Sequence, residues 1–513
     1  MTKTVCLTVL LAIPAPLCLA AGLPTDNPAA RYKLAWTDKA KWDQVVSIED
    51  FKGKDMIERI DKAQEALTKK GGGVIYFPAG KYEVNDTIKL KSNIILRGAT
   101  PEKVKDARKD DYAPPTKFIF PTYKPTFEGE GTPKDTAFKG VELADMNKDT
   151  HCGVVNIDLD HGHIHFGVSA YDMKQFEENF ATYGRNHIIY GNRVSAAAVL
   201  DPSVPRKHQH KWQRWTFRHR AAIEMRVAAN ALVANNRIPM SRKDNFTMKG
   251  YKVFAGTGTK ATKEIEVEFK YDNRPGIYMN YGTVSGTPET KPTCFVKGMH
   301  IRENYVYCDG CLAIGFSGDG TYCGYNIVRY GKGVYLPIYN GYNESHHVNN
   351  VRAVEMRGWR WTVEHNDYLV YKNVFDKEQG LCYNDGEGLM HESHCNVDIR
   401  DSKLINNKGN SYLCLWRAPM NGLLIKGNEI DTPNKMWGAI CVNGRTHRSK
   451  KKLIIKNVHI LDNITRQAGI MIVGKEGENN IIKGNRHEGP NGFIRNLIDP
   501  KAEVSDNEGY ETK

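Results

Sequence analysis

Residues 71–100 read GGGVIYFPAGKYEVNDTIKLKSNIILRGAT, and this stretch decides the fold. Its apolar runs, Val74–Phe77 and Ile94–Leu96, are short and strand-like, and turn residues bound each of them. The preceding segment, Asp55–Lys70, carries apolar residues at helical spacing, and Gly71–Gly73 supply a helix stop. The pattern predicts one helix followed by very short strands and tight turns.

The rest of the chain repeats a short motif in which an asparagine precedes an apolar-rich strand. Successive copies after residue 300 lie 21 to 34 residues apart. The motif occurs at Asn192, Asn236, Asn304, Asn326, Asn350, Asn373, Asn407, Asn428, Asn457 and Asn485. A second strand of the form Gly-apolar-x-apolar lies between many copies, as at Gly358–Trp361 and Gly438–Cys441. Such a period without intervening helices is typical of a solenoid.

Leucine-rich repeats share this period, but their leucine spacing is missing from the sequence. We therefore predict an all-β fold, a single-stranded right-handed parallel β-helix in which each turn of the chain forms one rung. The helix Asp55–Lys70 would cover the strand edges at the N-terminal end of the solenoid. Asparagine side chains at the bends would hydrogen-bond from one rung to the next.

The N-terminus has the composition of a secretory signal peptide. Lys3 precedes the apolar run Val5–Leu19, and small residues follow near Ala20. A membrane anchor is the alternative, but the run is short and contains two prolines. We predict a signal peptide over 1–21 and an exported protein, extracellular or periplasmic, with no membrane association.

The predicted domain organisation places one β-helix between two terminal segments. An N-terminal extension covers 22–44, the β-helix covers 45–500 and a C-terminal tail covers 501–513. The predicted insertions lie near 200–222, where basic and aromatic residues alternate, and near 240–292, where lysine and threonine are frequent. We expect a monomer or a weak homo-oligomer.

The formal net charge is +13, which favours a polyanionic partner. The sequence contains no recognised DNA- or RNA-binding motif, so we expect no nucleic-acid partner. An acidic polysaccharide suits an exported protein better, and a solvated basic surface without a partner is the alternative. Cys308 and Cys311 have CxxC spacing, but nothing nearby completes a zinc site. We expect buried free thiols rather than a disulfide framework.

The segment that opens the repeats resembles the N-terminal signature of the pectate lyase superfamily of secreted β-helix proteins. The helix, GGGVIYFPAGKY and NIILRGA carry this resemblance over about 50 residues. It implies a β-helix that acts on carbohydrate, usually as a polysaccharide lyase or a glycoside hydrolase. The catalytic motifs of the polygalacturonases have no intact match, so their residues are not transferred.

Aligning the rungs on the Gly-apolar-x-apolar strand predicts a catalytic edge. The alignment stacks His365 on Glu387, with Asp385 beside them, because adjacent rungs lie about 4.8 Å apart. We predict His365 as the proton-abstracting base, and Asp385 with Glu387 as acid and base or as ligands of Ca²⁺. The alternative is an ordinary Asp/Gly turn. Asp319 is predicted to belong to a turn.

Substrate-binding residues are predicted around this edge. Arg417 and Arg445 would bind uronate or sulfate groups through bidentate contacts, and Trp416 would pack on a sugar ring. Trp359 and Trp361 are either sugar platforms or core residues. The basic segment 206–220, with Lys211 and Arg214, would hold a polyanion over the cleft, or it is a solvated insertion.

Three functions remain open at this point. A lyase cleaving an acidic, uronate-containing polysaccharide by β-elimination is favoured, because a basic cleft stabilises an enolate-like transition state. A glycoside hydrolase that uses Asp and Glu carboxylates, possibly on a sulfated polysaccharide, is the second. A non-catalytic glycan-binding or cell-surface protein is the third. We expect no cofactor other than Ca²⁺, which would serve the lyase.

Overall fold

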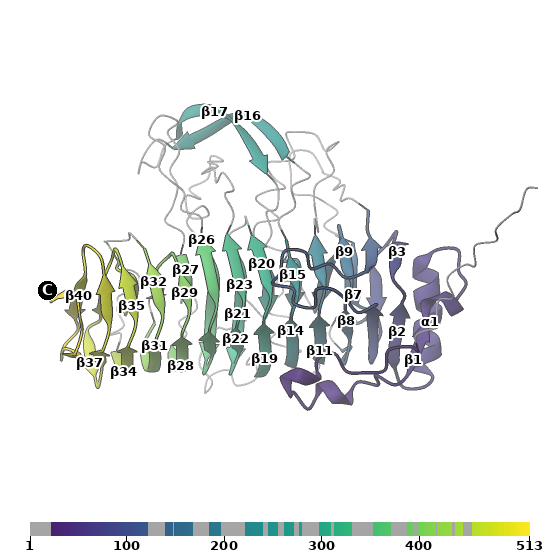
Figure 1. Ribbon diagram of the computed structural model, residues 1–513, viewed down its shortest axis with the longest axis horizontal. Helices are drawn as coiled ribbons and strands as arrows, with labels where there is room; N and C mark the ends of the chain where they lie inside the picture. The colour runs from purple at the N-terminus through teal and green to yellow at the C-terminus, as the bar shows by residue number, and fades with distance from the viewer. Residues whose placement is uncertain are drawn as a thin grey trace, which may run out of the picture.

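The computed structural model describes residues 22–121, 139–146, 148–167, 184–195, 221–239, 245–254, 261–270, 276–279, 297–308, 312–330, 352–370, 387–392, 398–416, 418–432, 437–444 and 454–512. Within them the chain forms an elongated stack of short parallel strands with one α-helix at its N-terminal end (Figure 1). The predicted right-handed parallel β-helix is confirmed.

Each rung contributes strands to three parallel ladders, which we call A, C and B in chain order. Ladder A comprises β1 (Val45–Ser47), β2 (Gly73–Phe77), β5 (Ile94–Gly98), β8 (Gly153–Val155), β11 (Arg185–Tyr190), β14 (Ala229–Ala234), β19 (Lys297–Arg302), β22 (Tyr322–Gly324), β25 (Thr362–Glu364), β28 (Ile399–Ile405), β31 (Met420–Lys426), β34 (Ile454–Leu461), β37 (Glu476–Glu478), β38 (Ile481–Lys483) and β41 (Glu503–Ser505). Ladder C comprises β3 (Gly80–Glu83), β6 (Thr116–Ile119), β9 (Asp158–Asp160), β12 (Arg193–Ser195), β15 (Arg237–Ile238), β20 (Tyr305–Cys308), β23 (Ile327–Tyr330), β26 (Asp367–Val370), β29 (Lys408–Gly409), β32 (Glu429–Asp431), β35 (Ile464–Arg466) and β39 (Arg486–Glu488). Ladder B comprises β4 (Ile88–Leu90), β7 (Gly140–Leu143), β10 (His163–Phe166), β13 (Ile223–Met225), β18 (Ile277–Met279), β21 (Leu312–Asp319), β24 (Arg352–Trp359), β27 (Glu387–Glu392), β30 (Leu413–Trp416), β33 (Ile440–Asn443), β36 (Ile470–Val473), β40 (Phe493–Leu497) and β42 (Glu511–Thr512).

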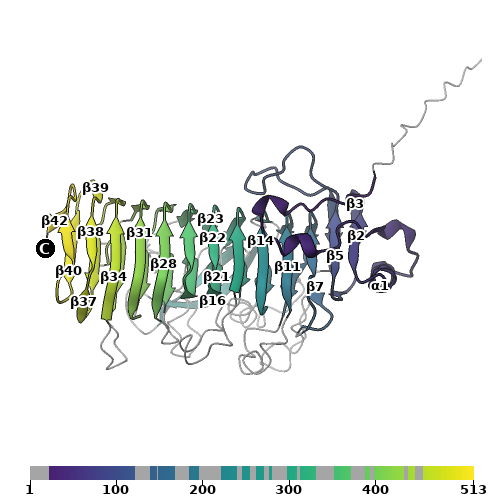
Figure 2. The same cartoon turned by 90° about the horizontal axis from the view of Figure 1, so that it is seen from below.

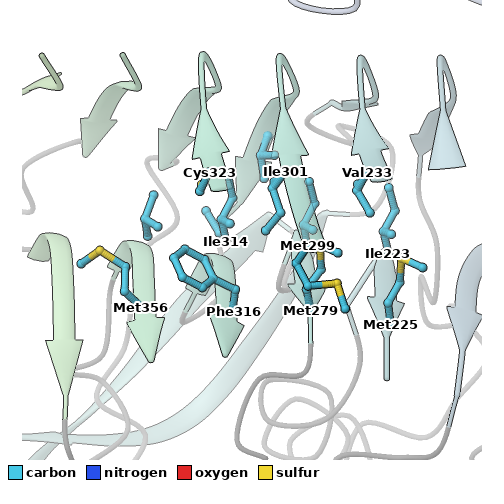
Figure 3. Packing of buried hydrophobic residues seen from close by; sticks show 14 of the residues in the cluster. Ile223, Met225, Val233, Met279, Met299, Ile301, Ile314, Phe316, Cys323 and Met356 are labelled. Carbon is cyan, nitrogen blue, oxygen red and sulfur yellow. The ribbon is translucent and has the colours of Figure 1, made fainter. Parts of the chain in front are cut away.

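The interior of the helix is a continuous apolar core. Inward side chains of successive rungs stack in columns, as Met225, Met279, Phe316 and Met356 do along ladder B (Figure 3). These four side chains are fully buried. Because the alternate residues of a strand face outward, each strand also presents a second set of side chains away from the core.

The α-helix α1 (Met56–Thr68) covers the N-terminal end of this core (Figure 2). Asp55 caps it, because its Oδ1 accepts a hydrogen bond from the Glu58 N–H at 2.9 Å. Gly71 and Gly72 end the helix with φ of 82° and 113°, a conformation that favours glycine. The predicted capping helix is thus confirmed, shortened slightly at both ends.

The buried asparagines form one continuous amide ladder at the bend between ladders A and C. Each side-chain N–H donates to the Oδ1 of the asparagine in the next rung, at 2.8 to 3.1 Å. The members are Asn192, Asn236, Asn304, Asn326, Asn366, Asn407, Asn428, Asn463, Asn485 and Asn507. The predicted ladder exists, but Asn366, Asn463 and Asn507 hold places in it that the sequence repeat missed. Asn457 belongs to a separate, exposed amide row with Asn421 and Asn479.

The terminal segments are more closely built into the fold than the sequence predicts. The N-terminal extension contains the 3₁₀ helices η1 (Ala30–Tyr32) and η2 (Thr37–Lys39), and η3 (Ile48–Asp50) follows β1. Tyr32 and Trp42 of the extension pack on the outward apolar residues of ladder A. At the other end, β41 pairs with β38 and β42 pairs with β40, so the predicted tail after residue 500 is wrong.

Some expectations concern residues that the structure describes only in part. The strands β16 (Asn245–Phe254) and β17 (Ala261–Lys270) form an antiparallel hairpin within the predicted 240–292 insertion (Figure 1). Segment 1–21 and most of 200–222 lie outside the described residues. Cys152, Cys323, Cys414 and Cys441 are buried free thiols, as expected. Among the described residues, no helix is long and apolar enough to cross a membrane.

Candidate functional site

Most of the predicted site residues lie outside the described part of the chain. Asp385, Arg417, Arg445, Lys211 and Arg214 are not described, so their roles stay predictions. The backbone of Glu387 opens β27 in ladder B. The calcium site assigned to Asp385 and Glu387 therefore also stays a prediction.

His365 does not stack on Glu387, and that part of the prediction is wrong. His365 lies in the bend between β25 and β26, at the edge of ladder A, whereas Glu387 pairs with Arg352 in ladder B. The His365 ring instead stacks on Tyr325, with centroids 4.8 Å apart and planes at 8°. The alignment failed because Gly358 lies near the end of its ladder B strand and not at the start of a rung.

The predicted aromatic platforms also have structural roles. Trp359 and Trp361 are 1% and 0% exposed, so they are core residues. Trp416 ends β30 and packs against Trp437, with ring centroids 4.5 Å apart at 62°. Asp319 is the last residue of β21, and its Oδ1 accepts a hydrogen bond from Arg360 Nε at 2.7 Å.

The structure reveals a different candidate site on the outward face of ladder B. Eight ionisable side chains follow one another there from β7 to β24, and we call them the ionisable row. They are Glu142, His163, His165, Glu224, Arg226, Tyr278, Glu355 and Arg357, and all are at most 9% exposed. Residues of these types are rarely buried without a specific role, because desolvating a charge is costly. Their burial outside the apolar core marks this face as a functional candidate.

The strand register places the row along the helix axis. Glu142 pairs with His165, His165 with Glu224, and Glu224 with Tyr278. The same column then continues through Gly315 to Glu355. From β7 to β24 there are five rung steps of about 4.8 Å, so the row is roughly 24 Å long.

One end of the row is a cluster around Glu142. Its Oε1 lies 3.3 Å from His163 Nε2, and its Oε2 accepts a hydrogen bond from Lys89 Nζ at 2.5 Å. Burial alone would raise the pKa of Glu142, but the contacts with His163 and Lys89 outweigh it and hold that pKa well below its usual range. Glu142 is therefore an ionised carboxylate at neutral pH.

The rest of the row contains two Glu–Arg ion pairs. Arg226 Nε lies 3.5 Å from Glu224 Oε1, and Arg357 Nη2 lies 2.8 Å from Glu355 Oε1. In each pair the arginine is two residues after the glutamate on the same strand, so both side chains point outward. The Arg357 guanidinium is fixed by hydrogen bonds from Nε and Nη2 to Glu355 Oε1, at 3.0 and 2.8 Å, which suits recognition of a carboxylate.

Between these pairs the row has a rung with small side chains. Gly315 of β21 lies directly between Tyr278 and Glu355, and Ser317 pairs with Arg357. Ser317 is 0% exposed, and its Oγ has no hydrogen-bond partner among the described residues. A buried hydroxyl without a partner is a candidate for contact with a ligand.

Two sequence signals could have identified this row. The chain contains Ile-Glu-Met-Arg at Ile223–Arg226 and Val-Glu-Met-Arg at Val354–Arg357, a repeated pattern of alternating apolar and charged residues. It also contains His163-Ile-His165 within an apolar strand. Period-two alternation puts such charged residues on the face opposite the core.

Sequence comparisons give no family for this chain: no family model and no curated protein matches it. The resemblance to the pectate lyase superfamily thus stays a prediction beyond the β-helix fold. Among solved structures, the catalytic unit of a GH87 alpha-1,3-glucanase from Streptomyces thermodiastaticus is 11% identical (TM-score 0.46), with 91% of this chain and 69% of that chain covered. The tailspike protein of E. coli bacteriophage HK620 is 12% identical (TM-score 0.45), with 91% and 71% covered. The A-module of mannuronan C-5 epimerase AlgE6 from Azotobacter vinelandii is 12% identical (TM-score 0.39), with 91% and 99% covered. We draw no conclusion about activity from similarities at this level.

Proposed function

We propose that this protein cleaves an acidic polysaccharide by β-elimination on the outward face of ladder B. The observation that carries the proposal is the ionisable row, a line of buried ionisable side chains along the helix axis. A linear polymer lying along that axis would meet new side chains at every rung. The net charge of +13 favours an anionic polymer over a neutral one.

The rung of Gly315 is the proposed position of the reacting sugar. Arg226 directly follows β13, two rungs before β21, and Arg357 belongs to β24, the next rung after it, and their guanidinium groups would neutralise the uronate carboxylate. Neutralisation stabilises the enolate-like charge that develops when the proton beside the carboxylate is removed. Ser317 would donate a hydrogen bond to the same sugar.

Tyr278 is the proposed proton acceptor, since its strand pairs directly with β21 at Gly315. As a phenolate, Tyr278 would take the C5 proton of the uronate, the C4–O bond would break, and the phenol would return the proton to the leaving oxygen. The electron pair of the C5–H bond forms a C4–C5 double bond, which is conjugated with the carboxylate in the product.

Hydrolysis is the second candidate, supported by one spacing. Glu142 and Glu224 belong to the same column two rungs apart, which is roughly 9.6 Å between their backbones. Inverting glycosidases hold their two carboxylates at about 6.5–9.5 Å. The ionised state of Glu142 would suit a base, so Glu224 would then have to be the acid.

The test is to identify the product from a panel of uronate-containing glycans. Elimination gives ultraviolet absorbance from the conjugated double bond, and hydrolysis gives reducing ends without it. We expect absorbance, and we expect Tyr278→Phe to reduce its rate by about 10²–10⁴-fold. Tyr412→Phe is the matched control, because Tyr412 is also buried but precedes β30 outside the row.

Other outcomes would reject elimination in different ways. Saturated products that disappear in Glu224→Gln would establish hydrolysis. If the protein binds glycans of the panel but forms no product from any of them, the result would support a non-catalytic glycan-binding protein. Export is also part of the proposal, and a purified extracellular or periplasmic form that begins near residue 22 would support it, whereas an intact segment 1–21 would contradict it.

A further inference from the structure

We infer that Glu142, His163 and His165 form a binding site for a divalent transition-metal ion such as Zn²⁺. The inference goes beyond the proposed elimination, because metal binding can be measured without any substrate. It rests on how two neighbouring strands present three buried ligand groups, on the spacing of their atoms, and on the chemistry of the donor set.

The strands hold the three residues in a rigid arrangement. His163 and His165 are two residues apart on β10, so both rings lie on the outward face of the same strand. Glu142 of β7 pairs directly with His165. Gly140 faces His163, and a Cβ at Gly140 would come within 2.2 Å of the His163 carbonyl oxygen, so the close approach of these strands requires glycine.

The distances suit shared coordination. One donor atom from each residue lies within 4.8 Å of the other two. His163 Nε2 and Glu142 Oε1 are 3.3 Å apart. Ligand bonds of about 2.0–2.1 Å in a tetrahedral zinc site place neighbouring donor atoms roughly 3.3–3.4 Å apart. The His165 donor lies within 4.8 Å of the other two and would move closer to them to complete the set.

The donor set selects the class of metal. Two imidazole nitrogens and one carboxylate oxygen suit zinc and related first-row ions, whereas Ca²⁺ prefers oxygen ligands alone. All three residues are buried, at 3% to 9% exposure, so an ion there would be shielded from solvent. Three protein ligands leave a further coordination position, as in catalytic zinc sites.

Lys89 would orient one of the metal ligands, Glu142. It donates to Glu142 Oε2, the oxygen that does not face His163. A metal-ligating carboxylate is commonly held by such a second hydrogen bond, which fixes its orientation. Glu142 would therefore bind through Oε1 alone.

Direct metal binding tests the inference. Protein stripped with a chelator is titrated with Zn²⁺ by calorimetry, and the visible spectrum of the Co²⁺-substituted protein is recorded. We expect one ion per chain at this site and the intense visible bands of four-coordinate Co²⁺. His163→Ala, His165→Ala and Glu142→Gln should each weaken Zn²⁺ binding more than tenfold.

His161→Ala is the matched control. His161 is two residues from His163, but its Nδ1 lies 3.2 Å from Asp160 Oδ1, away from the cluster. Its loss should leave the Co²⁺ spectrum and the Zn²⁺ affinity unchanged. Circular dichroism shows whether each variant is folded, and the Co²⁺ spectrum of the unaltered protein needs no variant. The inference is overturned if the unaltered protein binds no more Zn²⁺ than the His163→Ala/His165→Ala variant, or if no four-coordinate Co²⁺ bands develop.

Discussion

The outward face of ladder B changes character along the molecule, and this divides it into two sections. In the charged section, from β7 to β24, the outward column reads Glu142, His165, Glu224, Tyr278, Gly315 and Glu355. In the apolar section, from β30 to β36, the same column reads Cys414, Cys441 and Met471. There these residues cluster with Tyr412 and Phe493, and Trp416 and Trp437 pack against them.

The two sections share their backbone architecture and differ in these outward side chains. Both have the same parallel pairing, the same apolar interior and the same asparagine ladder. The backbone therefore places the same positions outward in every rung, and the choice of residue decides what each position does. Charged residues make a candidate site in one section, and apolar residues cover the sheet in the other.

The largest expected difference between the sections is in their response to acid. His187 of β11 is fully buried, and burial lowers its pKa to about 3, so it stays neutral in the folded protein. The unfolded chain takes up a proton near the ordinary pKa of about 6.5. Because the folded pKa is the lower one, stability falls as the pH drops below about 6.5 and stops falling near the folded pKa.

The corresponding loss for His187 is on the order of 5 kcal/mol, because its pKa falls by about 3.5 units at about 1.4 kcal/mol per unit. His300 adds to it, since burial and then Arg302 lower its pKa to about 4. Hydrogen exchange at pH 4 should therefore lose protection in the charged section first. A His187→Leu variant should flatten the pH dependence of the unfolding free energy between pH 6.5 and 4. Equal loss of protection in both sections would contradict this view.

The asparagine ladder should respond equally in the two sections. Asn304 of the charged section and Asn428 of the apolar section each donate to a backbone carbonyl and to the next asparagine, at 2.9 to 3.0 Å. Replacing either with alanine leaves buried groups without partners, which costs about 1–3 kcal/mol per group. We expect each variant to lose about 2–4 kcal/mol in denaturant unfolding. The exposed Asn457→Ala should change stability by less than about 0.5 kcal/mol, and a similar loss there would show that burial is not the cause.

Substitutions of two arginines test which part of ladder B carries the function. Arg226 belongs to the ionisable row, whereas Arg495 of β40, the strand that follows the apolar section, pairs with Met471 and lies 4.4 Å from the Phe493 ring centroid. Lysine keeps the charge but cannot make a bidentate contact with a carboxylate. On the substrate identified by the glycan panel, Arg226→Lys should lower kcat/KM by about 10–100-fold, a change of about 1.4–2.7 kcal/mol. Arg495→Lys should leave it unchanged, and the reverse order would place the site in the apolar section.

The smallest effects come from single hydroxyl groups. Cys441 is 0% exposed and packs in the apolar section, so Cys441→Ser buries a polar group there and should cost about 1–2 kcal/mol. Ser317→Ala in the charged section removes a hydroxyl whose oxygen has no partner among the described residues. Ser317→Ala should change the unfolding free energy by less than about 0.5 kcal/mol relative to the unaltered protein, or raise it. A large loss in Ser317→Ala would mean that Ser317 is a structural residue.

The sequence by itself determined the scaffold. Glycines at a helix end, short apolar runs and asparagines at a recurring interval are local signals, and each has a local physical cause. They were enough to predict the β-helix, the capping helix, the amide ladder and the buried thiols of Cys414 and Cys441.

Only the tertiary structure decided which residues are neighbours across the rungs. Consecutive members of the asparagine ladder are separated by as few as 21 residues, at Asn407 and Asn428, and by as many as 68, at Asn236 and Asn304. Rungs of such different length cannot be aligned by counting residues along the sequence. An alignment error of one residue exchanges the outward and inward side chains of a strand. His365 and Glu387 were paired by such a count. Glu142, His165 and Glu224 lie in one column because backbone hydrogen bonds, and not sequence spacing, set the register.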